Sequence, residues 1–173
     1  MIVTKKKPFE IEIPVLEQSI YALAPSQDAL IGRVIKLDLT RLLKGRNIDA
    51  SLIIKKENEK LVADFIKINL LPTYIRKMIR KNISYVEDSF VVQGKDSKVI
   101  IKPYLITKKR VHRKIRNALR LKAREVITAI IKDRDNREIF FSILSGQMQK
   151  EVSVGVKKIY PLSLSEIRMA KLK

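Results

Sequence analysis

Apolar and polar residues alternate in several short stretches of the first hundred or so positions, as they do in strands that are half buried in a sheet. The stretch LIGRVIKLDL, residues 30–39, alternates after Gly32. A strand here would point Val34 and Ile35 to opposite sides. The charged residues that follow, 40–47, contain a glycine and an asparagine and are typical of a loop.

Two further pairs of stretches have the pattern of hairpins. Residues 48–56 and 60–71 flank a short polar segment, 58–59, which predicts two antiparallel strands joined by a tight turn. Residues 83–106 hold two β-branched runs that meet around 94–97, which predicts a second hairpin.

The period changes to that of a helix in two places. Pro72 can occupy the first turn of a short helix over 72–81, in which Ile75, Met78 and Ile79 share one face. Residues 108–131 are predicted to form one long helix. Its apolar positions at helical spacing are Ile115, Leu119, Ala123, Val126 and Ile130.

The C-terminal part adds further helical segments. Asp133 or Asp135 is placed to cap a helix through 137–144, whereas 159–173 fits a helix or a strand equally well. The fold class is therefore α+β. Five or six short strands around one helix are expected to close or curl, since a flat sheet would leave its edges exposed.

The net charge of the chain indicates what kind of partner it binds. The 173 residues hold 37 Lys and Arg against 18 Asp and Glu, a net charge of +19, and 46% of them are hydrophobic. This describes a folding chain whose partner is a polyanion, and the default polyanion is nucleic acid. There is no cysteine, which excludes disulfides and Cys-ligated zinc and suits a reducing compartment.

The charge is concentrated in one basic block, residues 108–124, which contains nine Lys or Arg and no acid. These nine are Lys108, Lys109, Arg110, Arg113, Lys114, Arg116, Arg120, Lys122 and Arg124. Steps of three and four place several of them on one helical face. A solvated face is the alternative, but such faces usually mix signs so that i,i+4 pairs offset repulsion. We therefore expect contact with nucleic acid, with Arg76, Lys77, Arg80 and Lys81 of the short helix as further candidates.

The absence of known DNA-binding motifs and of Trp indicates which type of nucleic acid the chain binds. No helix-turn-helix spacing, zinc finger or basic zipper is present, and there is no Trp for a single-strand stacking platform. Structured RNA held through phosphates and 2′-hydroxyls fits better.

Other classes find little support in the sequence. His112 is the only histidine, and the close carboxylate pairs have no third partner nearby, so we expect no enzyme, no catalytic residues, no cofactor and no metal. No stretch approaches eighteen uninterrupted apolar residues, and no export signal is recognisable. A peripheral membrane or regulatory protein that binds anionic surfaces through the basic helix stays the alternative, although bulky residues facing a bilayer are missing.

Several blocks occur in the order of one known family: LIGRVIKLDL, SLIIKKENEKLVADFIKINLL, LITKKR, ALRLKAREV and KKIYPL. On these blocks the chain resembles the eS-one family, also called S-three-Ae, of archaeal and eukaryotic small-ribosomal-subunit proteins. The absence of the long eukaryotic tail favours an archaeal-type member.

The resemblance implies a single domain over 1–173, with an N-terminal arm (1–30), an irregular antiparallel β-barrel (31–106) with a short inserted helix, and a mainly helical part (107–173). It implies a structural, non-enzymatic protein of the cytoplasmic small ribosomal subunit, on the platform near the messenger-RNA exit and the 3′ region of the ribosomal RNA. Expected partners are that RNA and neighbouring platform proteins, with mRNA nearby, no membrane and no homo-oligomer. Arg33 is a weaker RNA-binding candidate.

The N-terminal arm departs from the family, since residues 1–30 carry a net charge of −1 and lack the expected Trp and basic start. A protein neighbour is as plausible there as RNA.

Overall fold

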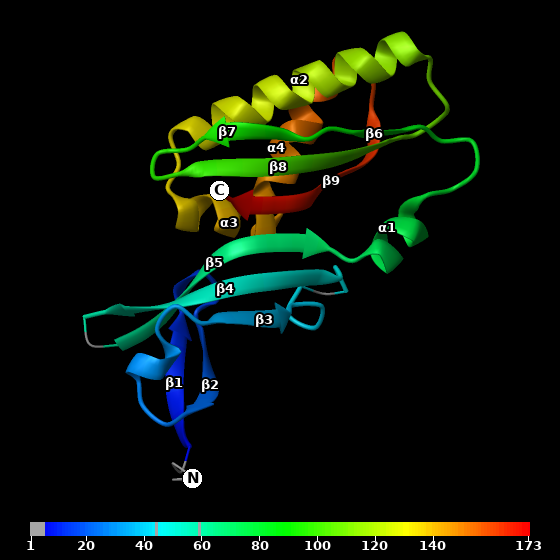
Figure 1. Ribbon diagram of the computed structural model, residues 1–173. Helices are drawn as coiled ribbons and strands as arrows, with labels where there is room; N and C mark the ends of the chain where they lie inside the picture. The colour runs from blue at the N-terminus through cyan, green and yellow to red at the C-terminus, as the bar shows by residue number, and fades with distance from the viewer. Residues whose placement is uncertain (1–5, 44, 59) are drawn as a thin grey trace.

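The computed structural model describes residues 6–43, 45–58 and 60–173 (Figure 1). The strands are β1 (Lys7–Ile13), β2 (Gln18–Ala24), β3 (Val34–Asp38), β4 (Ile48–Glu57), β5 (Lys60–Leu70), β6 (Tyr85–Glu87), β7 (Phe90–Gln93), β8 (Lys98–Thr107) and β9 (Leu162–Leu172). The helices are α1 (Pro72–Met78), α2 (Arg113–Lys132), α3 (Asn136–Ser145) and α4 (Gln147–Val156), with short 3-10 turns η1 (Pro14–Leu16) and η2 (Asp28–Leu30).

All these strands belong to one sheet with two branching strands. β5 pairs with β1, β4 and β9, and β8 pairs with β9, β6 and β7. The two halves of the sheet meet where β5 runs antiparallel to β9, over the short register from Lys67 to Asn69. The α+β class is confirmed.

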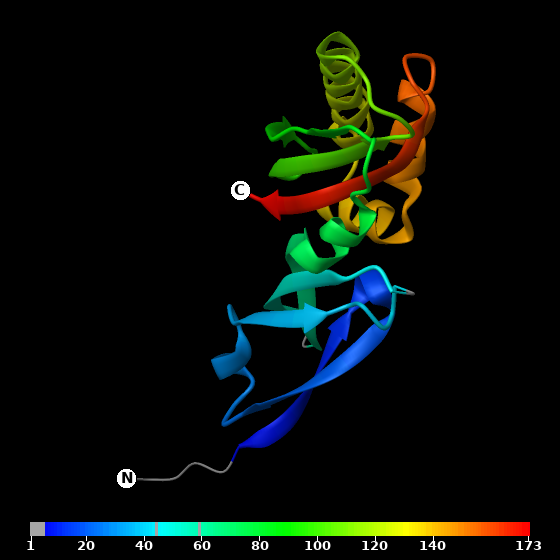
Figure 2. The same cartoon turned by 90° about the vertical axis from the view of Figure 1, so that its right-hand side faces the viewer.

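The expectation of a closed β-barrel is wrong. Within the described residues, β2, β3, β6 and β7 each pair with a single neighbour, so the sheet stays open. Helices α2, α3 and α4 lie along one side of the half formed by β7, β8 and β9 (Figures 1 and 2). These helices cover the apolar face of this half of the sheet. The sheet therefore does not have to close into a barrel to bury that face.

The hairpin of β4 and β5 was correctly predicted. Glu57 pairs with Lys60, and Asn58 adopts the left-handed conformation with φ of 46° that a tight turn requires. Glu59, the other predicted turn residue, lies outside the described residues. In β3, Val34 is exposed and Ile35 is half-buried, as the alternation predicts.

The second hairpin is formed by β7 and β8, and the Gly94 N–H donates to the Ser97 carbonyl at 2.9 Å. β6 pairs separately with β8 and is divided from β7 by two residues. The short helix α1 begins at Pro72 as expected but ends at Met78. Its stripe is incomplete because Ile75 is buried whereas Ile79 is exposed.

The C-terminal part is helical only up to α4. Leu119, Ala123, Ile127 and Ile131 form the buried face of α2, which contacts α4 and β7. Asp135, not Asp133, caps α3 in a capping box with Glu138. The ambiguous segment at the end is strand β9, between β5 and β8, so 107–173 is not helical throughout.

Candidate nucleic-acid interface

The segment before α2 is extended, not helical. Two polar residues hold it: the Thr107 N–H donates to the Ser84 carbonyl at 2.9 Å, and the Val111 N–H donates to Ser84 Oγ at 3.1 Å. The predicted helix start at residue 108 is therefore wrong by five residues. Both residues are buried, so this exchange of hydrogen bonds satisfies backbone groups that water cannot reach. Lys108, Lys109 and Arg110 are exposed on this ordered strap.

The first turns of α2 line a groove with strand β6. Arg113, Lys114, Arg116 and Arg120 form its α2 wall together with Asn117, and Tyr85, Val86 and Glu87 form its β6 wall. The cavity volume is about 710 Å³. The apolar residues of α2 point into the core, so the turn-by-turn spacing leaves the basic side chains to face this groove and solvent.

Two cations of the basic block are neutralised within the chain. Arg124 pairs with Asp88 at 2.9 Å, and Lys122 pairs with Glu125 at 2.8 Å. Among the described residues, no carboxylate oxygen lies within 4.0 Å of the other seven. The uncompensated part of the basic block therefore runs from Lys108 to Arg120.

The carboxylates next to the groove are also occupied. Arg168 of β9 reaches both oxygens of Glu87, at 3.1 and 3.0 Å, and Arg124 does the same to Asp88. With their charges matched inside the protein, these acids oppose an incoming phosphate less than free carboxylates would. The groove keeps a net positive potential.

An aromatic pair supports the β6 wall. Tyr85 stacks on Tyr104, with ring centroids 5.8 Å apart and planes at 25°. Tyr104 is fully buried, and this burial, with a smaller contribution from Glu87, raises the pKa of Tyr104 to about 12. Tyr85 is half exposed and contributes to the groove surface.

The remaining predicted residues lie elsewhere. Arg76 and Lys77 in α1, and Arg80 and Lys81 just after it, are exposed and not part of the groove, although α1 and the first turns of α2 both lie on the right-hand side of Figure 1. Arg33 is exposed in the turn before β3, in the other half of the sheet.

Comparison with known families decides the class of protein. The sequence model described as the ribosomal S3Ae family matches residues 3–173. The chain belongs to the ribosomal S3Ae family. The resemblance of its sequence blocks is thereby confirmed.

Relatives of this S3Ae member carry the name small ribosomal subunit protein eS1. One from Nanoarchaeum equitans is 27% identical over 152 residues, which cover 85% of this chain and 76% of that protein. Another from Saccharolobus islandicus is 28% identical over 121 residues, 69% of this chain and 58% of that protein. The chain thus spans little more than half of the length of the Saccharolobus relatives that it matches.

Family membership agrees with several expectations. S3Ae proteins are structural constituents of the small ribosomal subunit, cytoplasmic in archaea, and are not enzymes. The relatives named above are archaeal, as the archaeal-type pattern predicts.

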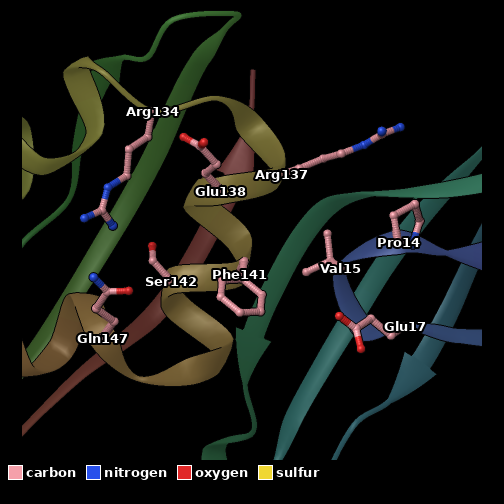
Figure 3. Close-up of a pocket in the computed structure, with 9 residues that line it drawn as sticks. All are labelled: Pro14, Val15, Glu17, Arg134, Arg137, Glu138, Phe141, Ser142 and Gln147. Atoms are coloured by element: carbon pink, nitrogen blue, oxygen red, sulfur yellow. The ribbon is translucent and has the colours of Figure 1, made fainter.

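A second hollow in the S3Ae chain lies between η1 and α3 (Figure 3). Val15 and Phe141 line it from its two sides. Its two arginines are already paired, Arg134 with Glu151 and Arg137 with Asp64 and Glu57. It is therefore a poorer phosphate site than the groove beside α2.

Sequence reasoning missed Tyr85 and Asn117 as groove residues. Tyr85 lies within the predicted hairpin of residues 83–106, but only its pairing with Ile106 places it opposite the start of α2. Asn117 follows Arg116 in the basic block, and its uncharged side chain gave no signal beside the Lys and Arg residues around it. No helix in the described ranges is long and apolar enough to cross a membrane.

Proposed function

We propose that this S3Ae protein binds the small-subunit ribosomal RNA through the basic block, on the platform near the mRNA exit and the 3′ region of that RNA. The contacts are made to phosphates and 2′-hydroxyls of a folded backbone. Arg113, Lys114, Arg116 and Arg120 make the central contacts, and Lys108, Lys109 and Arg110 extend them. Arg33, Arg76, Lys77, Arg80 and Lys81 are further, separate candidates.

The observation that supports this most directly is the run of seven uncompensated cations beside carboxylates that are already paired. Like charges held on one helix repel one another, at a cost of a few tenths of a kcal/mol per i,i+4 pair. An ordered surface of this kind becomes favourable when phosphates replace water and release their counterions. Arginine adds planar, bidentate hydrogen bonds to each phosphate.

Lys122 and Arg124 have a different role in this proposal. Each has a carboxylate partner in the same chain, so its contact with RNA would first break an ion pair. Arg124 lies in addition over the ring of Phe90, 5.1 Å from its centroid. We assign these two residues to the support of α2 rather than to RNA.

Partners other than RNA are neighbouring platform proteins, with mRNA nearby. The β1–β2 hairpin fits a protein neighbour, because Glu10, Tyr21 and Leu23 lie exposed on it. A homo-oligomer is not expected, since the net charge of +19 opposes self-association. The membrane alternative is weakened because the apolar face of α2 packs into the core and is not available to lipid.

Filter binding over a salt series tests the proposal. Replacing Arg113, Arg116 and Arg120 with Ala should flatten the plot of log affinity against log salt by about two to three, since each phosphate contact contributes roughly 0.7–0.9 to that slope. The matched control replaces Lys150, Lys157 and Lys158, which are exposed on and just after α4, with Ala and removes the same charge. An equal loss of slope in both variants would show that net charge, not this face, binds RNA.

A further inference from the structure

We propose that the groove between α2 and β6 holds an unpaired nucleotide of RNA, with its base stacked on Tyr85 and its flanking phosphates on Arg113, Arg116 and Arg120. This inference rests on the proposed function and names the form of RNA that this part of the surface takes. The basic block then has two parts, a strap and outer helix face for folded backbone and a pocket for one extruded base.

Tyr85 provides the platform. Its side chain is 50% exposed although it is large and aromatic. One face of its ring stacks on the buried Tyr104, so the ring is held in place before any ligand arrives. A fixed aromatic ring with a free face is the surface on which single-stranded bases stack, and each such contact strengthens binding by about fivefold to a hundredfold.

The opposite wall supplies the phosphate contacts. Arg113, Arg116 and Arg120 follow one another at steps of three and four along α2, about 10 Å from first to last at 1.5 Å per residue. That length reaches more than one phosphate of the same strand. None of the three has a carboxylate partner among the described residues, so none must break an ion pair to bind.

Hydrogen bonds within the protein already orient one polar side chain in each wall of the groove. Arg120 Nη2 donates to Asn117 Oδ1 at 2.8 Å, which leaves the Asn117 amide N–H groups free to donate toward a base edge. Glu87 is engaged through both oxygens by Arg168. The groove therefore offers donors and positive charge to the nucleotide, and its acid is neutralised.

A paired base cannot use this site. Bases inside a duplex are already stacked on their neighbours, so a ring on the β6 wall adds nothing to duplex binding. Duplex RNA would contact the arginines alone. The groove volume of about 710 Å³ lies within the range of roughly 300–1,000 Å³ usual for small-molecule sites, which suits a nucleotide.

The test uses the full chain and two short RNAs of equal length and charge, one single-stranded with a central 2-aminopurine and one hairpin with the same base paired. Tyr85→Ala should lower affinity for the single strand by about fivefold to a hundredfold and abolish quenching of the 2-aminopurine, while the salt slope and hairpin affinity stay unchanged. Tyr85→Phe should keep both affinities. The control, Tyr21→Ala, removes another exposed tyrosine from the other half of the sheet and should change neither.

The outcomes separate the two proposals. If the triple arginine variant keeps the full salt slope, the proposed function fails. If that slope falls but Tyr85→Ala binds the single strand normally, or loses hairpin and single strand equally, only the nucleotide site is overturned. Tyr85→Leu, which keeps bulk over Tyr104, should also lose the quenching and serves if the Ala variant unfolds. Binding of 5′-AMP as tight as that of the oligonucleotide would overturn the contribution of flanking phosphates.

Discussion

Arg124 on α2 and Asp88, between β6 and β7, form a two-pronged ion pair. Arg124 Nε donates to Asp88 Oδ2 at 3.0 Å, and Nη2 donates to Oδ1 at 2.9 Å. The hydrogen bonds that Arg124 donates to the Asp88 carboxylate raise the pKa of Arg124 above its usual value. Arg124 follows three arginines of α2, Arg113, Arg116 and Arg120, that have no carboxylate partner among the described residues. The same helical spacing therefore provides arginines for RNA and one arginine that supports the fold.

Arg124→Ala should therefore destabilise the fold by about 1–2 kcal/mol and leave RNA binding near normal. The loss combines a partly exposed ion pair, a cation–π contact with Phe90, and an Asp88 carboxylate that stays almost buried without its partner. Urea unfolding measures the first effect and the salt slope of RNA binding the second. Arg120→Ala is the matched control, and it should lower the salt slope of RNA binding while leaving the free energy of unfolding almost unchanged. Equal effects of the two variants on RNA binding would refute this division.

The sequence predicted local structure best where the pattern itself is local. Strands β4 and β5 pair with Glu57 opposite Lys60, and Asp135 caps α3 with Glu138 three residues later. Such features depend on residues a few positions apart. Propensity and spacing are then sufficient.

The predictions from the sequence failed where contacts between residues far apart in the chain determine the structure. Lys108, Lys109 and Arg110 have good helix propensity, but Ser84 accepts the Val111 N–H and holds the strap extended. β9 was ambiguous because its strand character comes from pairing with β8 and β5, far away in sequence. The barrel was wrong for the same reason, since nothing local says that helices will cover the sheet. The groove needed the register of β6 against β8, which no short pattern encodes.

A second ion pair joins the two halves of the sheet. Arg46, in the loop before β4, donates through Nη2 to Glu166 Oε2 of β9 at 2.7 Å and through Nη1 to the Leu144 carbonyl at 3.1 Å. Glu166→Gln should cost about 2–4 kcal/mol, because it leaves a largely buried guanidinium without its counter-charge. Denaturant unfolding measures this cost. Replacing both residues, Arg46→Met with Glu166→Leu, should cost less than either single change, and a simple sum of the two losses would argue against the coupling.

Asp64 should give the fold a measurable acid sensitivity. Burial alone would raise the pKa of Asp64, but hydrogen bonds from Arg137 at 2.8 Å and Lys55 at 3.1 Å outweigh it, so the pKa is lowered. A carboxyl group whose pKa is lower in the folded state stabilises the fold above its unfolded pKa of about 4 and loses that contribution as the pH falls through the folded pKa. The stability difference between the wild type and Asp64→Asn should be full at pH 7 and shrink below pH 4. A difference that stays constant over pH 2–7 would contradict this linkage.

Gly155, inside α4, allows α4 to approach α2 closely. A Cβ at this position would lie 2.8 Å from Val126 Cγ2 and 3.4 Å from Val126 Cγ1, and the first distance is shorter than side chains tolerate. In an exposed helix, replacing Gly with Ala would stabilise the protein by up to about 1 kcal/mol. Here Gly155→Ala should instead destabilise it by about 1–3 kcal/mol, because the new methyl group forces the two helices apart.

A second substitution, at Val126, tests whether this clash explains the loss of stability expected for Gly155→Ala. Val126→Ala removes the Cγ2 methyl group that clashes, together with Cγ1. The double variant Val126→Ala with Gly155→Ala should therefore recover most of the stability lost by Gly155→Ala alone, and thermal unfolding would measure this rescue. Since α2 carries the groove arginines, Gly155→Ala should also weaken single-stranded RNA binding while the double variant restores it. If the single change Gly155→Ala stabilised the chain, as helix propensity alone predicts, the close packing of α2 on α4 would be disproved.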